Sequence, residues 1–210
     1  MLSDLSKKSV SVKSVAEKAL KDEKVFSEVL EGLTSKKETI RFNSFKILLL
    51  ISEKHPKVLY PKWDFFAEFL SSDNTYHKYI AIYIIANLTK IDTKNKFEKT
   101  FDKYYNLLND KSVIPAAHLA GKSGKIAKAK PKLQTKITNK LLSIDKTHHD
   151  PERRDLIKGY AIESFSEYFE EAKNKKGIME FVKEQLTSKS PRTKKKAKEF
   201  LKKIMNKESK

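Results

Sequence analysis

The stretch Leu33-Thr-Ser-Lys-Lys-Glu-Thr-Ile40 decides the fold, because versions of it recur along the chain. Each version starts with an apolar residue, passes through a polar turn and, in every copy but one, ends with a β-branched residue. The copies end at positions 12, 40, 77, 113, 157 and 193, so the steps after the first are 37, 36, 44 and 36 residues. A nearly constant step of this length indicates a repeat protein.

A helix with one apolar stripe follows each of these turns. Counted from the last residue of the turn, apolar or small residues recur at offsets 0, 4, 8 and 11, which lie within about 80° on a helical wheel. Offset 4 always holds a small residue that lets a neighbouring helix approach closely: Ala16, Ser44, Ala81, Ala117, Ala161 and Ala197. We therefore expect the stripe to be buried against neighbouring helices.

A second set of apolar residues, three or four apart, precedes each turn and predicts another helix there. These sets are Phe26/Val29/Leu33, Trp63/Phe66/Leu70, Phe101/Tyr104/Leu108, Leu133/Ile137/Leu141 and Met179/Val182/Leu186. Pro56, Pro61 and Pro131 fall where first helical turns accept proline. Strand signals are missing, because no period-two alternation is sustained and no Asn-Gly or Asp-Gly turn occurs. Each unit is thus a first helix, a polar turn and a second helix.

The chain resembles the HEAT/armadillo class of helical repeats over residues 5–205. The apolar residue that ends each turn, the small residue at offset 4 and the basic residue after the turn carry the resemblance; the basic residues are Lys13, Arg41, Lys78, Lys158 and Lys194. The resemblance implies that these basic residues join acidic turn residues in a ladder between repeats, with Asp73, Asp110 and Asp155 as candidates. The copy at 113 departs from the pattern, because Ile114-Pro115 replaces the basic residue and Gly121 and Gly124 replace apolar ones. We expect its second helix to be short or broken after Leu119.

A single helix pair cannot bury its own apolar faces, so neighbouring pairs must stack and share a core. We therefore predict an all-α, right-handed α-solenoid of about five helix-pair repeats plus an N-terminal half-repeat. The predicted boundaries are a half-repeat at 1–21, repeats at about 22–54, 56–92, 95–127, 130–174 and 176–206, and a disordered tail at 207–210.

The net charge of +18 is concentrated in the second half of the chain. Residues 111–210 hold 26 basic and 12 acidic residues, a net charge of +14, and no acidic residue lies between Asp110 and Asp145. Such asymmetry attracts polyanions. The lysines expected to contribute are Lys122, Lys125, Lys128, Lys130, Lys194, Lys195, Lys198 and Lys202. The alternative is a lysine-biased composition with a solvated surface, since only four of the 45 basic residues are arginine.

Few residue patterns point to chemistry. The absence of cysteine excludes thiol nucleophiles and cysteine zinc sites. Gly121-Lys122-Ser123 ends like a phosphate-binding loop but follows a predicted helix, where such a loop needs a strand. His148-His149-Asp150, with Glu152, is either a metal site or an inserted turn whose Asp150-Pro151 begins the next helix. We favour the turn and expect neither a cofactor nor a metal.

One class of enzymes uses this architecture, the alkylpurine DNA glycosylases built from HEAT-like repeats. They resemble this chain in length, helicity and basic charge, and they hold DNA against aromatic residues of a concave face. The single tryptophan here, Trp63, falls in a core position of a first helix, so the chain offers no counterpart of that cleft. Catalysis is therefore the remotest of the readings.

Offsets 2, 6, 9 and 13 point away from the buried stripe, and in HEAT-type solenoids the second helices line the concave surface. In the early copies these positions hold apolar and aromatic residues: Phe42, Lys46, Leu49 and Glu53; Tyr79, Tyr83, Ala86 and Lys90; and Pro115, Leu119, Lys122 and Ile126. Exposed aromatic residues beside lysines are typical of binding hot spots. We predict partner contacts at Phe42, Lys46, Tyr79, Tyr83 and Lys90. The alternative is that strong curvature or a homodimer buries Phe42, Leu49, Tyr79 and Tyr83.

The function that these patterns favour is a non-catalytic scaffold or adaptor that binds a protein or peptide on its concave face. The second hypothesis is a nucleic-acid-associated protein that uses its basic C-terminal half, with binding that is weak and sensitive to salt. The first residues lack the apolar segment of a signal peptide, and no uncharged apolar stretch approaches 18 residues, so we expect a cytoplasmic protein without membrane contact.

Overall fold

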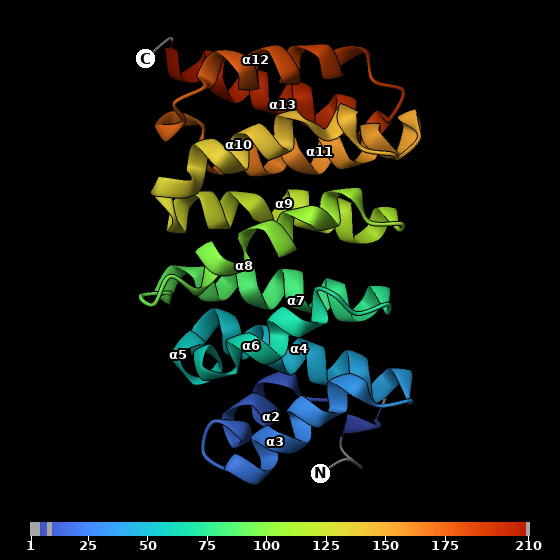
Figure 1. Cartoon of the computed structure of the whole chain (residues 1–210), viewed down its shortest axis with the longest axis vertical. Helices are drawn as coiled ribbons and strands as arrows, with labels where there is room; N and C mark the ends of the chain where they lie inside the picture. Colours follow the sequence, from blue (N-terminus) through green and yellow to red (C-terminus); the bar gives the residue numbers. More distant parts are fainter. Residues whose placement is uncertain (1–4, 8–9, 209–210) are drawn as a thin grey trace.

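The computed structural model describes residues 5–7 and 10–208, and in this part of the chain every regular element is a helix (Figure 1). The α-helices are α2 Val12–Ala19, α3 Glu23–Glu31, α4 Glu38–Lys54, α5 Pro56–Leu59, α6 Trp63–Phe69, α7 Thr75–Leu88, α8 Lys96–Tyr105, α9 Val113–Ala129, α10 Gln134–Leu142, α11 Pro151–Tyr168, α12 Lys175–Glu184 and α13 Pro191–Glu208. Short 3-10 turns follow or precede most of them. The prediction of an all-α chain is confirmed.

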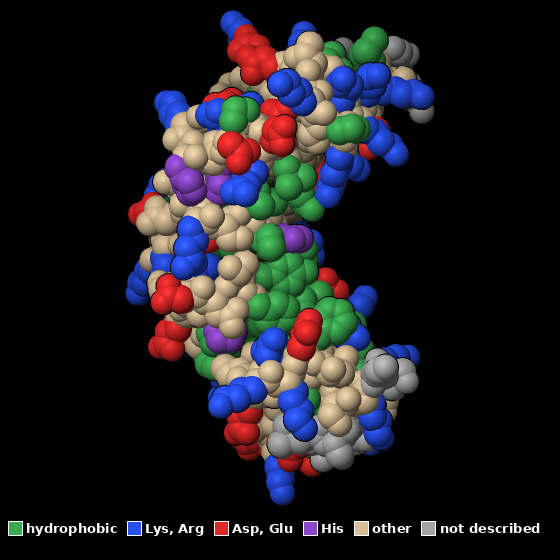
Figure 2. All heavy atoms as spheres, turned by 90° about the vertical axis from the view of Figure 1, so that its right-hand side faces the viewer, with side chains coloured by type: hydrophobic (Ala, Val, Ile, Leu, Met, Phe, Trp, Pro, Cys, Tyr) green, Lys and Arg blue, Asp and Glu red, His purple; other side chains and the backbone are tan. Residues whose placement is uncertain are grey.

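The helices stack in chain order from one end of the molecule to the other (Figure 1). The longer helices α4, α7, α9, α11 and α13 each pack against the next in this series, and α2 packs against α4. The shorter helices pack against this row from one side, with α3 on α4, α6 on α7, α10 on α9 and α12 on α13. Viewed from the side, the stack is a crescent with a hollow edge (Figure 2).

The small residues of the repeat stand where the helices meet, as the pattern predicts. All six, from Ala16 to Ala197, are buried. The offset 11 positions are buried as well, namely Ile51, Leu88, Gly124, Tyr168 and Ile204. At these two offsets the periodic register read from the sequence is therefore that of the core, whereas Val113 and Gly121, at offsets 0 and 8 of α9, are only partly buried.

The first helix of the second repeat is broken, because proline lies inside it. Here α5 ends at Leu59, a 3-10 turn covers Tyr60–Lys62, and α6 starts at Trp63. Pro61 has no N–H to donate and so favours the tighter turn. Trp63 is buried, as its place in the predicted core requires, and its indole N–H donates to Thr100 Oγ1 at 3.1 Å.

The predicted break after Leu119 is wrong: α9 runs unbroken from Val113 to Ala129. Its two glycines allow α11 to pack closely against it. A Cβ on Gly124 would lie 2.8 Å from the Ser164 carbonyl oxygen of α11, and one on Gly121 would lie 2.9 Å from the Tyr160 ring. The Ser164 hydroxyl also accepts a hydrogen bond from the Gly124 N–H and donates to the Ala120 carbonyl, which joins the two backbones.

Helix α13 extends beyond the predicted end of the last repeat. It reaches Glu208, so two residues of the segment that we expected to be disordered are helical, and 209–210 lie outside the described residues. The inserted turn in the fourth repeat behaves as predicted. Pro151 is the first residue of α11, and the Asp150 side chain accepts a hydrogen bond from the Arg153 N–H.

The polar ladder between repeats forms in part. Lys78 and Asp110 are an ion pair with both side chains buried, which joins the second repeat to the turn of the third. Asp155 instead accepts from the Ser188 hydroxyl at 2.6 Å, in the turn of the next repeat. Of the other residues predicted to pair, Arg41 donates to the carbonyls of its own turn, and exposed Asp73 lies 4.0 Å from Lys111.

Candidate partner-binding surface

Aromatic rings from four successive long helices are joined by ring contacts, and we call them, together with Phe42 one turn before Phe45, the aromatic face. Its members are Phe42 and Phe45 on α4, Tyr76, Tyr79 and Tyr83 on α7, His118 on α9 and Tyr160 on α11. Figure 2 shows hydrophobic side chains gathered in the hollow of the crescent, with a histidine among them. Helical spacing explains the gathering, since residues three or four apart share one side of a helix.

The α7 tyrosines are the centre of this face. The ring centroids of Tyr79 and Tyr83 lie 4.7 Å apart, and Phe45 meets them edge-on at 5.3 and 6.0 Å. Both tyrosines are partly buried. Their outer parts therefore remain accessible, while their inner parts pack against the next helix.

Phe42 lies one turn before Phe45 and is the most accessible ring of the face. Its side chain is 51% exposed, and Lys46 Nζ lies 4.5 Å from its centroid. The α4 ring that contacts the tyrosines is that of Phe45, one turn further along the helix. The alternative in which the single chain buries Phe42 does not hold.

His118 joins the rings of α7 to those of α11. Its Nδ1 lies 2.9 Å from Tyr83 Oη, and its ring centroid lies 4.7 Å from that of Tyr79 and 5.6 Å from that of Tyr160. Burial, with the nearby Lys122 and Arg192 charges, lowers the pKa of His118, and burial raises the pKa of Tyr83. The lowered pKa favours the neutral histidine at pH 7, and in the tautomer that carries its proton on Nε2 the tyrosine hydroxyl donates to Nδ1.

The contacts continue to the last helix through Tyr160. The Arg192 guanidinium carbon lies 4.0 Å from the Tyr160 ring centroid, and one of its N–H groups donates to Tyr160 Oη at 2.8 Å. Arg192 also pairs with Glu163 at 3.2 Å. The charge of Arg192 is therefore already matched within the chain.

Lys122 has a different environment. Its Nζ lies 4.4 Å from the Tyr83 ring centroid, and its side chain is partly buried. Burial, with the neighbouring Lys125 charge, lowers the pKa of Lys122. Among the described side chains, no carboxylate lies within 4 Å of this ammonium group.

A charged groove of about 520 Å³ continues the aromatic face toward the C-terminal ends of the long helices. It is lined by Glu53, Ala86, Asn87, Lys90, Lys125, Lys128, Ala129 and Glu167. Lys125 Nζ donates to Asn87 Oδ1 at 2.8 Å and lies 3.8 Å from Glu53. Lys90 Nζ donates to the Glu53 carbonyl at the end of α4. Lys128 is exposed.

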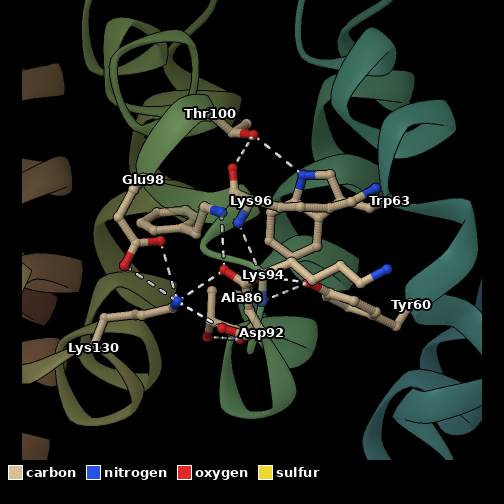
Figure 3. Close-up of polar contacts among 11 residues, drawn as sticks. Tyr60, Trp63, Ala86, Asp92, Lys94, Lys96, Glu98, Thr100 and Lys130 are labelled. Atoms are coloured by element: carbon tan, nitrogen blue, oxygen red, sulfur yellow. Dashed lines mark hydrogen bonds and ion pairs between the residues drawn. The ribbon is translucent and has the colours of Figure 1, made fainter.

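Lys130 does not belong to this surface, although the sequence grouped it with the other lysines. It is buried in the network of Figure 3, with Nζ 2.8 Å from Asp92 Oδ2 and 3.1 Å from Glu98 Oε2. The Asp92 carboxylate also accepts from the Tyr60 hydroxyl and from two backbone N–H groups. Although burial opposes ionisation, these hydrogen bonds hold the pKa of Asp92 below its ordinary value.

The remaining predicted lysines line a second groove on α13, of about 480 Å³. Its lining residues are Lys189, Pro191, Lys194, Lys195, Lys198, Glu199 and Lys202. Lys195 Nζ lies 4.0 Å from Glu199, one turn away on the same helix. The lysines of this groove lie on or just before α13, and the groove does not extend across the row of long helices.

The sequence reading missed Phe45, Tyr76, His118 and Tyr160, and it wrongly put Pro115, Leu119 and Ile126 on the floor of the hollow, where the structure has them buried. Helix α9 is turned relative to that prediction, because α11 approaches its glycines closely. A signal was present: Phe45, Tyr83, His118 and Tyr160 follow one another at 38, 35 and 42 residues, close to the repeat step.

The histidine pair of the inserted turn has a structural contact on each ring. His148 Nδ1 lies 2.7 Å from Asn109 Oδ1, and His149 Nε2 lies 3.2 Å from the Leu108 carbonyl oxygen. Within residues 5–7 and 10–208, no three His, Asp or Glu side chains are arranged to hold a metal ion. In the same residues, no helix has the length and apolar character needed to cross a bilayer.

Comparison of the chain with models of protein families, with curated proteins and with solved structures found no match.

Proposed function

We propose that the chain is a right-handed α-solenoid of the HEAT/armadillo type, with about five helix-pair repeats and an N-terminal half-repeat. The support is the agreement of a repeat step of 36 to 44 residues with the series of contacts α4–α7–α9–α11–α13. The buried small residue at the same offset in all six copies adds to it. In such a stack one surface, built from equivalent positions of successive helices, is available to a partner.

We further propose that the protein is a non-catalytic scaffold or adaptor that binds a protein or peptide on the aromatic face. The observation that carries this proposal is a set of aromatic rings from four helices of which all but the buried Phe45 stay partly accessible, with Phe42 half exposed. Isolated surface aromatics are common, but a contiguous accessible cluster is typical of an interaction site. Aromatic side chains also supply much of the binding energy at hot spots.

A homodimer is the alternative occupant of this face. Two copies of a chain with a net charge of +18 repel each other, which opposes self-association at moderate ionic strength. The alternative is settled by the same experiment as the proposal, because a cross-link between copies has a distinct mass.

The test is site-specific photocross-linking in cells that express the protein. A benzophenone amino acid replaces Phe42, and in a matched control it replaces Val58, which is 40% exposed on α5. We expect a discrete cross-linked protein from position 42 that disappears when Tyr83→Ala is added. Equal products from both positions, or products that contain only this chain, contradict the proposal.

A second candidate function is binding of nucleic acid, and the lysine groove on α13 is the observation in its favour. We expect weak, sequence-independent binding of a 20-base-pair duplex that fades between about 50 and 200 mM salt. Replacement of Lys194, Lys195, Lys198 and Lys202 by Gln should remove most of it. Binding that persists at physiological salt with a clear sequence preference makes nucleic acid the main partner instead.

A further inference from the structure

We propose that the segment bound on the aromatic face is acidic: it carries an apolar side chain that packs on Phe42, Tyr79 and Tyr83, and nearby Asp or Glu side chains that pair with Lys122 and Lys128. This inference rests on the proposed function, since it names the partner of the same surface. It commits to a protein segment rather than a nucleic acid or a second copy of this chain.

The first argument is the position of Lys122. Its ammonium group lies against the Tyr83 ring, partly buried and without a carboxylate partner among the described side chains. The carboxylates that act on this cation, those of Glu53, Glu163 and Glu167, lie beyond ion-pair distance, so a partly desolvated ammonium group lacks a close counter-ion. A carboxylate that arrives beside an apolar anchor on Tyr83 supplies that interaction and adds a charge-assisted hydrogen bond.

The second argument is the charge balance of the adjoining surface. The charged groove and Lys122 together hold four ammonium groups, from Lys90, Lys122, Lys125 and Lys128, against the carboxylates of Glu53, Glu163 and Glu167, of which Glu163 is already paired with Arg192. Glu53 is already 3.8 Å from Lys125. The excess is positive, so complementarity favours an acidic ligand.

The third argument is spacing. Lys122 and Lys128 are six residues apart on α9, which corresponds to about 9 Å along the helix and about 120° around it, with Lys125 between them. An extended peptide places alternate side chains about 6.5 to 7 Å apart on one side. Acidic residues two to four positions from an apolar residue on the tyrosines therefore span the axial separation of the two lysines, and the charged groove leads around α9 from Lys125 to Lys128.

The carboxylates in the same area argue against nucleic acid as the ligand. A phosphodiester backbone carries a charge at every nucleotide and needs a continuous positive track. Here carboxylates flank the lysines on α9 and just after α7 on both sides, with Glu53 on α4 and Glu163 and Glu167 on α11. An acidic peptide, whose charges are discrete, can pair with the lysines and avoid the glutamates.

The test uses a displayed library of random 12-residue peptides, selected on the full chain at about 150 mM salt. We expect enriched peptides to combine Asp or Glu with an aromatic or aliphatic residue within four positions. Synthetic copies should bind about tenfold more weakly to Lys122→Gln, as loss of a hydrogen bond to a charged group implies. They should bind more weakly to Lys128→Gln and to Phe42→Ala as well.

The control variant is Lys99→Gln, an exposed lysine on α8, a helix of the other layer. It should leave affinity unchanged, and thermal unfolding should show that every variant is folded. Enriched peptides that depend on Phe42 but lack acidic residues and ignore both lysine changes overturn this inference while the proposed function stands.

Two further results separate the remaining explanations. If no enriched peptide depends on Phe42 or Tyr83, the proposed function itself fails. If a 12-nucleotide single-stranded DNA binds in a Lys122-dependent way at the same salt and displaces the selected peptides, the site recognises a polyanion, and the assignment to an acidic protein segment is wrong.

Discussion

Lys122 and Lys130 are eight residues apart, one in the middle of α9 and the other just after its end, yet their environments differ completely. Lys130 is buried between Asp92 and Glu98 and joins two repeats. Lys122 lies on an aromatic ring at the surface of the hollow without a carboxylate partner in the described part of the chain. A lysine next to a turn meets the turn of the neighbouring repeat, whereas a lysine on the outward side of a helix meets solvent or a ligand.

The same division applies to other lysines of the chain. Lys78, in the first turn of α7, is buried in an ion pair with buried Asp110, and Lys158, in the middle of α11, is buried and pairs with the more exposed Asp145 of the turn before that helix. Lys128, Lys198 and Lys202 are exposed on outward helical positions. The net charge of +18 therefore overstates the positive charge available for binding, because some of the lysines are buried in ion pairs.

The largest effect that tests this difference between buried, paired lysines and exposed lysines is expected at Lys130. Replacement by Met keeps most of the apolar stem but leaves the Asp92 carboxylate buried without its cation, which should cost about 3–5 kcal/mol in the free energy of unfolding. Lys128→Met removes an exposed charge and should stay within about 0.5 kcal/mol. Urea unfolding of the two variants measures the difference, and similar losses at both positions contradict the division.

The next largest effect tests the packed side of the helices against the open side. Ala161 is fully buried where α11 meets its neighbours, so Ala161→Leu should overpack the contact and cost about 1–3 kcal/mol. Lys90→Leu, at an exposed position, should cost little. Thermal unfolding of both variants is the measurement, and equal losses would show that the periodic register is wrong.

The two glycines of α9 allow a finer version of the same test. A Cβ on Gly124 would meet the backbone of α11 at 2.8 Å, whereas one on Gly121 would meet the movable Tyr160 ring. Gly124→Ala should therefore cost about 1–2 kcal/mol, after the gain in helix propensity is counted. Gly121→Ala should cost clearly less. If denaturant unfolding shows that Gly121→Ala loses more stability than Gly124→Ala, the close approach of α11 does not explain the glycines.

The repeat pattern sufficed to predict the helices and their buried stripe, because both depend on spacing along a single helix. The place of Trp63 in the core and the start of α11 at Asp150-Pro151 followed from local rules of the same kind. The unbroken α9 could not be predicted in this way. Its glycines allow close packing against α11, and the residues of α11 that they contact lie about 40 positions later in the chain.

The candidate site was predictable in part for the same reason. The partly accessible positions of Tyr79 and Tyr83 could be predicted, since they follow from the helical wheel of α7 alone. His118 and Tyr160 were missed, because their contribution depends on how far α9 and α11 turn against their neighbours. The burial of Lys130 depends on Asp92 and Glu98, which lie on either side of the boundary between the second and third repeats.

The smallest predicted effect concerns the histidine at the centre of the aromatic face. His118 is surrounded by Tyr79 and Tyr83 from α7, Tyr160 from α11, Arg192 from α13 and Lys122 on its own helix. Burial and the two cations lower its pKa from the ordinary value of 6.5. Because the unfolded chain then binds a proton more readily than the folded one, this contribution to stability is present above pH 6.5 and is lost as the pH falls through the lower folded pKa.

We therefore expect the melting temperature to fall between about pH 7.5 and about pH 5, and we expect His118→Gln to narrow this difference. Glutamine keeps a hydrogen-bond acceptor for the Tyr83 hydroxyl but cannot be protonated in this range. His77 and His149, whose pKa values burial also lowers, keep part of the dependence in both proteins, so the difference narrows without vanishing. The exposed His55→Gln is the matched control and should leave the dependence unchanged. An equal fall in the wild type and in His118→Gln would mean that the aromatic face accommodates a charged His118 without strain, and that the packing of its rings is looser than the contacts described above.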